Sequence, residues 1–315
     1  MSIYGVNYLK ILDKTCFICG SKIFATSLQG DYIKCVACGH ETIKNYKHQS
    51  FIINEILSVE GINKQGLLDK FKQKVLKKCT VTNDFLLDVG SASGKFLYHN
   101  KSFFKRCAGI EVTEECISFA KNHLGLEIVK DISEVTNNIS VATFWHSLEH
   151  MSDENIQKIL DVINSKSSDD TRVIISVPNN ESLQYALFGD RYAYYDLQSH
   201  IHQFSVKSLD KLMEKYGFEK QCNFYSFPYS SFGYLQGFVN LVNPIHNYLY
   251  YRKKRGQTFT KSKGKILFLD IYNFLFLLLF ILPSLLFSIH DLIHLDKGSV
   301  ITACYKKKIT NKQVY

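Results

Sequence analysis

The chain has 315 residues, enough for about two domains, and 46% of them are hydrophobic, which suffices for a buried core. This composition excludes disorder for most of the chain, and four prolines beside 14% aromatic residues exclude collagen-like and low-complexity architectures. The formal charge of +9 is too small by itself to indicate a nucleic-acid-binding protein. The N-terminal sequence has no basic segment followed by an apolar one, so we expect a cytoplasmic protein.

Four of the nine cysteines cluster near the N-terminus, in the sequences CFICG and CVACG. Cys16, Cys19, Cys35 and Cys38 form two C-x2-C pairs, a spacing with which two tight turns close a tetrahedron around zinc. A glycine follows each pair, where such turns often need a positive φ. The spacing predicts a structural zinc ribbon over residues 1–48, with reduced cysteines or a redox pair as alternatives and His40 as a substitute ligand. Four thiolates leave no open position on the metal, so this zinc stabilises and does not catalyse.

Strands and helices alternate through the centre of the chain. Residues 49–83 have an apolar pattern of helical period, interrupted near Gly61, and we interpret them as a helical connector. The segments FLLDVG, RCAGIEV, LEIVKD, SVATFW and VIISVPN then predict strands separated by helices. This alternation predicts an α/β fold over residues 84–228, with a Rossmann-like, doubly wound and mostly parallel sheet. Ligands of such sheets bind at the carboxyl ends of the strands.

The turn after the first of these strands differs from a dinucleotide fingerprint. It reads D-x-G-x-A-x-G instead of G-x-G-x-x-G, and a carboxylate at that point repels a pyrophosphate. The segments LLDVGSASGKFL, GIEV, VKD, FWHSLEHM and VIISVPN, in this order, resemble the class I S-adenosylmethionine-dependent methyltransferases, in particular the bacterial branch with a W-H-x-L-E-H motif. The resemblance covers about residues 84–226. It also implies a final antiparallel strand beside the sixth one, and GSVITACYKK in the segment 298–315 fits that strand.

The resemblance implies a cofactor site made of residues at the strand ends: Asp88, Gly90, Ala92, Gly94, Glu111, Asp131, Trp145 and His146. The loop 88–94 would lie beneath the methionine part of S-adenosylmethionine, although an alanine stands where the family usually has a second glycine. Glu111 would accept hydrogen bonds from both ribose hydroxyls, and Asp131 would face the adenine edge. Trp145 and His146 would line the pocket wall. The alternative is that the acids only cap helices and line a crevice.

Histidines near two strand ends are the candidates for catalysis. Methyl transfer from a sulfonium is an in-line displacement, so alignment supplies much of the acceleration, and a base assists when the acceptor is a hydroxyl. We predict catalytic roles for His146, His150 and His202, and a substrate contact for Glu149. His202 is preferred over His200 because it resembles the family's histidine before F-S. Together His146, Glu149, His150 and His202 are similar to the divalent-metal site of ubiquinone-type and small-RNA O-methyltransferases. The nitrogen ligands of this set suit magnesium poorly. Purely structural roles are the third possibility.

An aromatic segment between the fifth strand and His200 occupies the position from which this family usually covers its acceptor. Tyr192, Tyr194 and Tyr195 lie in it. Because tyrosine serves both in binding and in packing, we predict these three as acceptor contacts, with packing as the alternative.

Residues 229–297 form an insertion before the last strand that the family does not explain. The insertion contains YRKKRGQTFTKSKGK, which is basic without any acidic residue, and then a strongly apolar segment at 266–289. As one helix this segment would be about 36 Å long, enough to cross about 30 Å of hydrocarbon. Crossing would separate the last strand from its sheet. We therefore predict that Pro283 breaks the segment into two helices that dip into one leaflet and return.

The insertion determines where we expect the protein in the cell. Residues 252–295 would contact the inner face of the membrane, with the basic run against anionic headgroups. A buried or dimer-forming insertion and a true membrane span are the alternatives. The patterns together predict a membrane-associated bacterial methyltransferase with a small, glycan-type or lipid-linked acceptor. The other hypotheses are a methyltransferase that holds RNA or DNA with its ribbon, and a cofactor-binding protein without activity. The densest basic run lies beside the apolar insertion, which favours lipid over nucleic acid.

Overall fold

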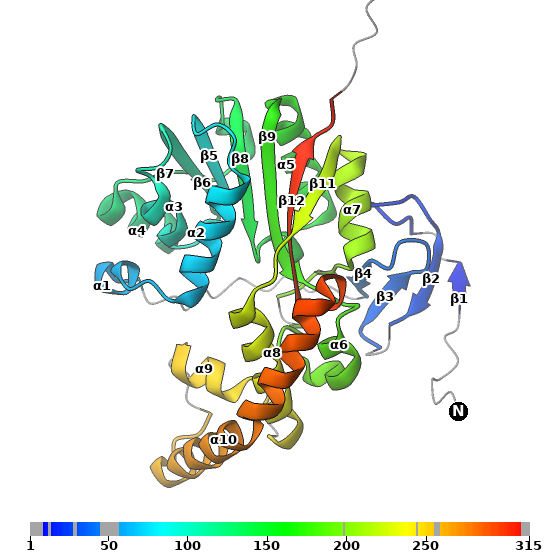
Figure 1. Ribbon diagram of the computed structural model, residues 1–315, viewed down its shortest axis with the longest axis vertical. Coiled ribbons are helices and arrows are strands. Elements are labelled where there is room, and N and C mark those ends of the chain that lie inside the picture. The colour runs from blue at the N-terminus through cyan, green and yellow to red at the C-terminus, as the bar shows by residue number, and fades with distance from the viewer. Residues whose placement is uncertain are drawn as a thin grey trace, which may run out of the picture.

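The computed structural model describes residues 9–11, 14–27, 30–44, 57–197, 199–243, 245–254 and 259–309. These residues form a seven-stranded sheet, a five-stranded sheet and a group of helices that extends away from the large sheet (Figure 1). Residues 49–56 of the predicted connector and the end of the predicted tail lie outside the described residues.

The seven-stranded sheet has the order β11-β12-β9-β8-β5-β6-β7. Its strands are β5 (Phe85–Val89), β6 (Arg106–Ile110), β7 (Glu127–Val129), β8 (Ile139–Trp145), β9 (Ser167–Pro178), β11 (Phe218–Asn223) and β12 (Val300–Lys307). Neighbours from β7 to β9 pair in parallel, whereas β12 is antiparallel to both β9 and β11. The predicted mostly parallel sheet with a final antiparallel strand is therefore confirmed.

Helices cover both faces of this sheet, which explains why β8 is apolar and buried along its whole length. The helices are α1 (Val59–Asn63), α2 (Leu67–Cys79), α3 (Lys95–Asn100), α4 (Glu114–Leu124), α5 (Asp153–Ser165) and α7 (Val206–Lys215). α2, α3 and α4 share one apolar core, and α5 and α7 pack into the core on the other face. In α5 the buried residues Ile156, Ile159, Leu160 and Ile163 recur every three or four positions, as one face of a helix requires.

The five-stranded sheet is the cysteine-rich module. Its strands are β1 (Leu9–Ile11), β2 (Ile23–Thr26), β3 (Tyr32–Cys35), β4 (Glu41–Ile43) and β10 (His202–Gln203). β10 comes from the central part of the chain and pairs with β4, so the two regions share one sheet. The Tyr32 hydroxyl also donates to the His200 carbonyl at 3.0 Å. The positive φ expected after each cysteine pair is present at Gly20 (73°) and Gly39 (80°).

Residues between β11 and β12 form α8 (Phe227–Val242), α9 (Tyr248–Lys254) and α10 (Lys263–Ile293), which lie beyond one end of the sheet (Figure 1). The prediction that Pro283 breaks the apolar segment was wrong, because α10 continues through it. A proline removes one helical hydrogen bond. Contacts with α8 on both sides of Pro283, through Asn273 and through Asp291, favour the unbroken helix, because it keeps these residues on one face.

Candidate active site

Asp88 lies near the carboxyl end of β5, next to the carboxyl ends of the parallel neighbours β6 and β8. Its carboxylate is buried and accepts a hydrogen bond of 2.6 Å from the Thr143 hydroxyl on the neighbouring strand β8. Burial raises the pKa of Asp88 from 3.8 to about 6, although the Thr143 hydrogen bond and the charge of Lys72 oppose the shift. A carboxylate in this state lacks a full set of partners and favours a cation beside it.

The loop after β5 and the end of β6 are joined by one side chain. Glu111 follows β6, and its carboxylate accepts hydrogen bonds of 2.8 Å from the backbone amides of Ala92, Val112 and Thr113. Gly90, Ala92 and Gly94 all have positive φ, at 77°, 47° and 79°. Ala92 adopts a conformation that costs an alanine energy, so the bond from its amide to Glu111 helps hold the loop. The two acids therefore lie at adjacent strand ends around one ordered loop.

The raised pKa of Asp88 predicts a pH-dependent stability difference between wild type and Asp88→Asn. The folded-state pKa of about 6 lies above the ordinary value of 3.8, so stability from Asp88 is present below about pH 4 and is lost as pH rises through 6. Between pH 4 and pH 8 the variant should therefore gain about 3 kcal/mol relative to wild type. Urea unfolding of both proteins at several pH values measures this, and a difference that stays constant with pH would contradict the shift.

Trp145 and Asp131 stand at the ends of the next strands. The Trp145 ring packs edge-on against Phe96, with centroids 5.3 Å apart, and its buried Nε1 has no hydrogen-bond partner among the described residues. Ser91 Oγ in the loop is buried and without a partner in the same way. Asp131 caps a short 3-10 helix by accepting from the Ser133 amide at 2.8 Å, and its second oxygen accepts from Lys158. Its contact with an adenine edge stays a prediction.

A histidine and glutamate cluster follows β8. His146 has a positive φ of 56°, and its Nδ1 lies 3.3 Å from Oε1 of the fully buried Glu149. The ring of His200 lies 4.7 Å from that of His150. Ligand atoms of Glu149, His150 and His200 all fall within 4.8 Å of one another. Two imidazoles and one carboxylate form a donor set better suited to a transition metal than to magnesium.

Contacts within this cluster determine the charges of Glu149 and His200. Burial alone would raise the pKa of Glu149, but the His146 hydrogen bond and the nearby His150 and His200 lower it to about 2. Burial, together with His150, lowers the pKa of His200 to about 4. Near neutral pH Glu149 is therefore an anion and His200 is uncharged. An ionised Glu149 favours a proton on Nδ1 of His146, which leaves Nε2 as the proton acceptor.

Two tyrosines cover His146. Tyr194 lies parallel to its ring at 6.1 Å, and Tyr229 from the first turn of α8 lies 4.9 Å from it. The Tyr194 hydroxyl donates to the Tyr229 carbonyl at 2.8 Å, which ties the two segments together. Tyr229 was not predicted from the sequence, and its only signal was its place at the start of the aromatic insertion.

Three predicted residues have other positions. His202 is fully buried between the cysteine module and α5, with Nδ1 3.1 Å from His40 Nε2, so His200 and not His202 joins the cluster. Tyr192 is also fully buried and donates to the Ser299 carbonyl. Tyr195 donates to Asp31 at 3.1 Å in the cysteine module. These contacts favour packing roles for the three side chains, whereas their predicted roles in catalysis or acceptor binding stay predictions.

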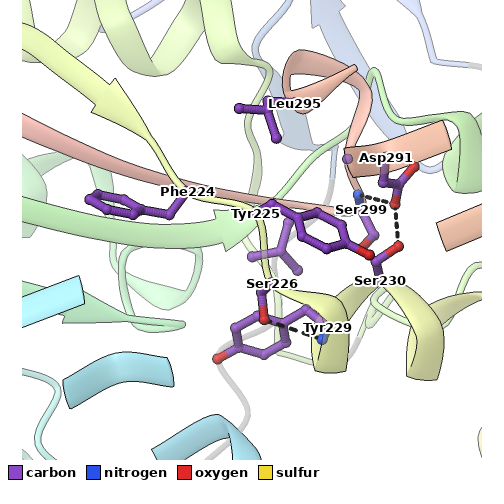
Figure 2. A pocket seen from close by; sticks show the side chains of 10 residues that line it. Phe224, Tyr225, Ser226, Tyr229, Ser230, Asp291, Leu295 and Ser299 are labelled. Carbon is purple, nitrogen blue, oxygen red and sulfur yellow. Dashed lines mark hydrogen bonds between the residues drawn. The ribbon is translucent and has the colours of Figure 1, made fainter. Parts of the chain in front are cut away.

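A small cavity lies where α8 and α10 join the large sheet (Figure 2). Its volume of about 10 Å³ holds about one water molecule. Tyr225, Ser230, Asp291 and Ser299 line it, and so does Tyr229, the residue that packs against His146. Tyr229 is thus a neighbour of both this cavity and His146.

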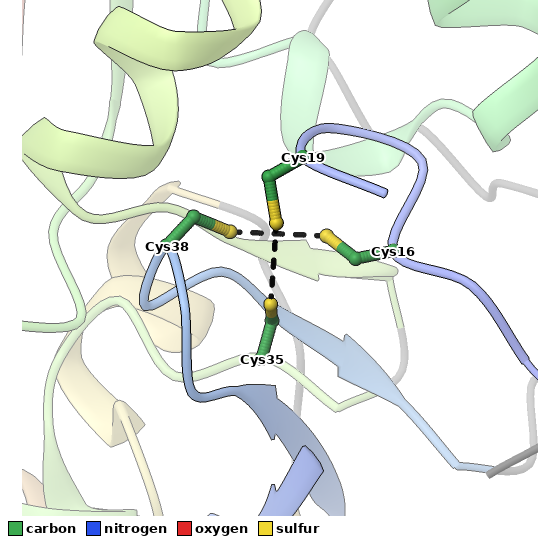
Figure 3. Close-up of side chains that lie close together, drawn as sticks. All are labelled: Cys16, Cys19, Cys35 and Cys38. Carbon is green, nitrogen blue, oxygen red and sulfur yellow. Dashed lines mark hydrogen bonds between the residues drawn. The ribbon is translucent and has the colours of Figure 1, made fainter. Parts of the chain in front are cut away.

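The four N-terminal cysteines converge from two turns (Figure 3). The Sγ atoms of Cys16 and Cys38 are 3.8 Å apart, those of Cys19 and Cys35 are 3.5 Å apart, and all four lie within 4.8 Å of one another. These distances exceed a disulfide bond of about 2.05 Å. A tetrahedron with zinc–sulfur bonds of about 2.3 Å has edges of about 3.8 Å. The donor set and spacing thus fit a structural zinc ion.

Comparison with solved structures gives similarities of low identity. A SAM-dependent methyltransferase from Archaeoglobus fulgidus is 16% identical, with a TM-score of 0.44 over 76% of this chain and 93% of that one. An S-adenosylmethionine-dependent methyltransferase from Clostridium acetobutylicum is 11% identical, with a TM-score of 0.44 over 80% and 95%. One from Mesorhizobium loti is 11% identical, with a TM-score of 0.44 over 77% and 100%.

The comparison with curated proteins found no match. The family model of a methyltransferase domain matches residues 62–223, which is just over half of the chain and includes every strand from β5 to β11. The resemblance of the strand-end motifs to class I S-adenosylmethionine-dependent methyltransferases is thereby confirmed, and the chain belongs to the methyltransferase-domain family.

Proposed function

We propose that this protein transfers a methyl group from S-adenosylmethionine to a small, glycan-type or lipid-linked acceptor beside His146. The observation that carries the proposal is the arrangement of Asp88 and Glu111 around the loop 90–94 at adjacent strand ends. This arrangement lies next to the pair of half-buried His146 and buried Glu149, so a donor site and a base belong to the same edge of the sheet.

The residues around the loop fit S-adenosylmethionine. Glu111 uses three amide donors, and a carboxylate can accept about four hydrogen bonds, so it retains acceptor capacity for ribose hydroxyls. Buried Asp88 would gain a partner from the positively charged methionine end. Ser91 Oγ and Trp145 Nε1 are buried polar atoms without a partner among the described residues, and a bound ligand would supply one. When bound, the cofactor supplies an electrophilic methyl group on a sulfonium.

His146 is the proposed base. Glu149 holds its Nδ1 proton, and the buried Nε2, which has no partner among the described residues, accepts the proton of the acceptor. Tyr194 and Tyr229 pack against the ring, so that 23% of the His146 side chain stays exposed. The acceptor must align with the methyl carbon, because displacement at the sulfonium is in line. Glu149, His150 and His200 also offer a donor set for a divalent metal, which this mechanism does not require.

Glu149→Gln is expected to slow methyl transfer about 100-fold, since an uncharged amide no longer stabilises the protonated His146. Membrane and cytosolic extracts incubated with methyl-labelled S-adenosylmethionine, then divided into organic and aqueous phases, measure the transfer. The binding of S-adenosylmethionine should stay within about threefold of wild type. His123→Gln, at an exposed histidine on α4, is the matched control. Equal transfer by wild type and Glu149→Gln would remove the base from the mechanism.

We place the protein on the cytoplasmic face of a membrane, attached through residues 252–295. The long apolar helix α10 supports this location.

A further inference from the structure

The fully buried residues of the helix α10 are polar, and its exposed residues are mostly apolar. Among the described residues it is the one helix long and apolar enough to cross a membrane, yet only 6% of its apolar window is buried. The exposed apolar side chains on it include Leu267, Phe268, Ile271, Phe274, Leu275, Leu278, Leu279, Leu282, Leu286, Ile289 and Ile293. The buried residues are Asn273, Ser284, Ser288 and Asp291. This distribution is the reverse of that in a helix on the surface of a water-soluble domain.

The polar side of α10 is held by α8. Asn243 donates to Asn273 at 2.6 Å near the far end of the pair. At the near end Asp291 accepts from Ser230 at 2.7 Å and from Tyr234 at 2.9 Å. These bonds join the helices along nearly the whole length of α8, so the orientation of α10 is fixed.

The other side of α8 packs on the catalytic domain. Phe238 lies between α6 (Leu183–Phe188) and α10, with its ring centroid 5.0 Å from that of Phe188 on α6 and 5.2 Å from that of Phe280 on α10. Asn240 donates to the Arg191 carbonyl at 3.0 Å, and Gln184 donates to the Ser230 carbonyl at 3.0 Å. A spanning α10 would pull these polar segments into hydrocarbon, where unsatisfied backbone groups are costly. Only one long side of α10 is thus available to lipid.

Basic residues mark the end of α10 that lies far from the sheet. Lys261, Lys263 and Lys265 are exposed there. Asp270, the only acidic residue between 259 and 270, lies 3.6 Å from Arg252, which offsets its charge. The apolar side and its cationic end together match an anionic bilayer, in which lipid tails cover the leucines and headgroups meet the lysines.

We infer that α10 lies flat in the interface of an anionic lipid bilayer, with its polar side toward α8 and its apolar side in one leaflet. The inference rests on the proposed membrane location and gives it an orientation. It also adds to the proposed function, because Tyr229 in the first turn of α8 packs against the ring of His146. The acceptor site is therefore held at the lipid surface, as an acceptor carried by a lipid requires.

Vesicle flotation of the full chain tests the docking. Wild type should float with vesicles of phosphatidylcholine and phosphatidylglycerol. Leu278→Gln with Leu282→Gln should weaken binding at least tenfold, because each removes an exposed leucine from the apolar side. Leu67→Gln with Val112→Gln, at two apolar residues outside the insertion that are at least as exposed, should leave binding to vesicles unchanged. Lys261→Gln with Lys263→Gln and Lys265→Gln should weaken binding about 100-fold on anionic vesicles only.

The depth of two tryptophans separates a flat helix from a spanning one. Phe268→Trp and Leu286→Trp are 18 residues apart on the same side of α10, about 27 Å along its axis. Lipids brominated at different depths should quench both equally in a flat helix, at a shallow position. Quenching at depths that differ by more than about 15 Å would mean a span and would overturn the orientation.

Binding of S-adenosylmethionine, measured on the same samples, keeps the two proposals apart. Wild type that binds the cofactor but stays with the aqueous fraction would overturn only the docking. A discrete dimer without vesicle binding, abolished by Leu278→Gln with Leu282→Gln, would assign the apolar side to a second copy of the chain instead. Flotation without cofactor binding would overturn the proposed function and leave the docking intact.

Discussion

Glu111→Ala is expected to lower the affinity for S-adenosylmethionine at least 100-fold. Glu111 fixes the loop through the Ala92 amide and offers the same carboxylate to the ribose. A hydrogen bond to a charged group contributes about 1.5–3 kcal/mol, so the loss of two bonds to ribose hydroxyls corresponds to a factor of about 100 or more. Isothermal titration calorimetry of wild type and variant measures the change.

Glu115→Ala is the matched control, since Glu115 is exposed in the first turn of α4, four residues from Glu111. Its affinity should equal that of wild type. Because Glu111 also pairs three backbone amides, the unfolding temperature of Glu111→Ala must be measured as well. A folded Glu111→Ala protein that binds the cofactor as tightly as wild type would separate this carboxylate from the donor site.

Cys35→Ser should release one zinc ion per chain and lower the unfolding temperature by at least about 10 °C. Structural zinc contributes folding free energy directly, and a loss of about 5 kcal/mol shifts a domain of this size by about 2–4 °C per kcal/mol. The effect should extend beyond the ribbon, because β4 pairs with β10 and Tyr32 holds the His200 carbonyl. Zinc content by mass spectrometry of metals and thermal unfolding by calorimetry test both parts.

Cys107→Ser provides the comparison for this variant, because Cys107 lies on β6, outside the cluster of four. It should keep the zinc content of wild type. Chelation of wild type should reproduce the instability of Cys35→Ser. If Cys35→Ser retains the zinc and the stability of wild type, the four cysteines do not form a metal site.

The sheet and its ligand edge could be predicted from the sequence because both depend on local signals. The runs FLLDV and RCAGI became β5 and β6, and Asp88 lies near the end of the first run while Glu111 directly follows the second. The cysteine pairs were equally informative, since C-x2-C spacing fixes the turn that presents both sulfur atoms.

The sequence is less informative where tertiary packing decides the position of a side chain. His200 and His202 are two residues apart, and only the pairing of β10 with β4 shows that His202 turns toward His40 while His200 meets His150. Tyr192 and Tyr195 lie beside Tyr194, yet only Tyr194 meets His146. No local pattern in the sequence distinguishes the three.

Pro283 shows the same limit for a helix. Proline disfavours a helix interior, but contacts with α8 at Asn273 and Asp291 favour one continuous α10. The apolar content of this segment is visible in the sequence, whereas the direction of its polar residues depends on contacts with residues 30 to 61 positions earlier in the chain.

A structure of the protein with bound S-adenosylhomocysteine tests the donor site most directly. We expect both ribose hydroxyls within about 3 Å of the Glu111 carboxylate, the amino-acid end beside Asp88, and the sulfur atom facing the His146 side of the site. A nucleoside bound elsewhere, or a Glu111 that keeps its amide contacts while the ribose lies outside hydrogen-bond distance, would contradict the account.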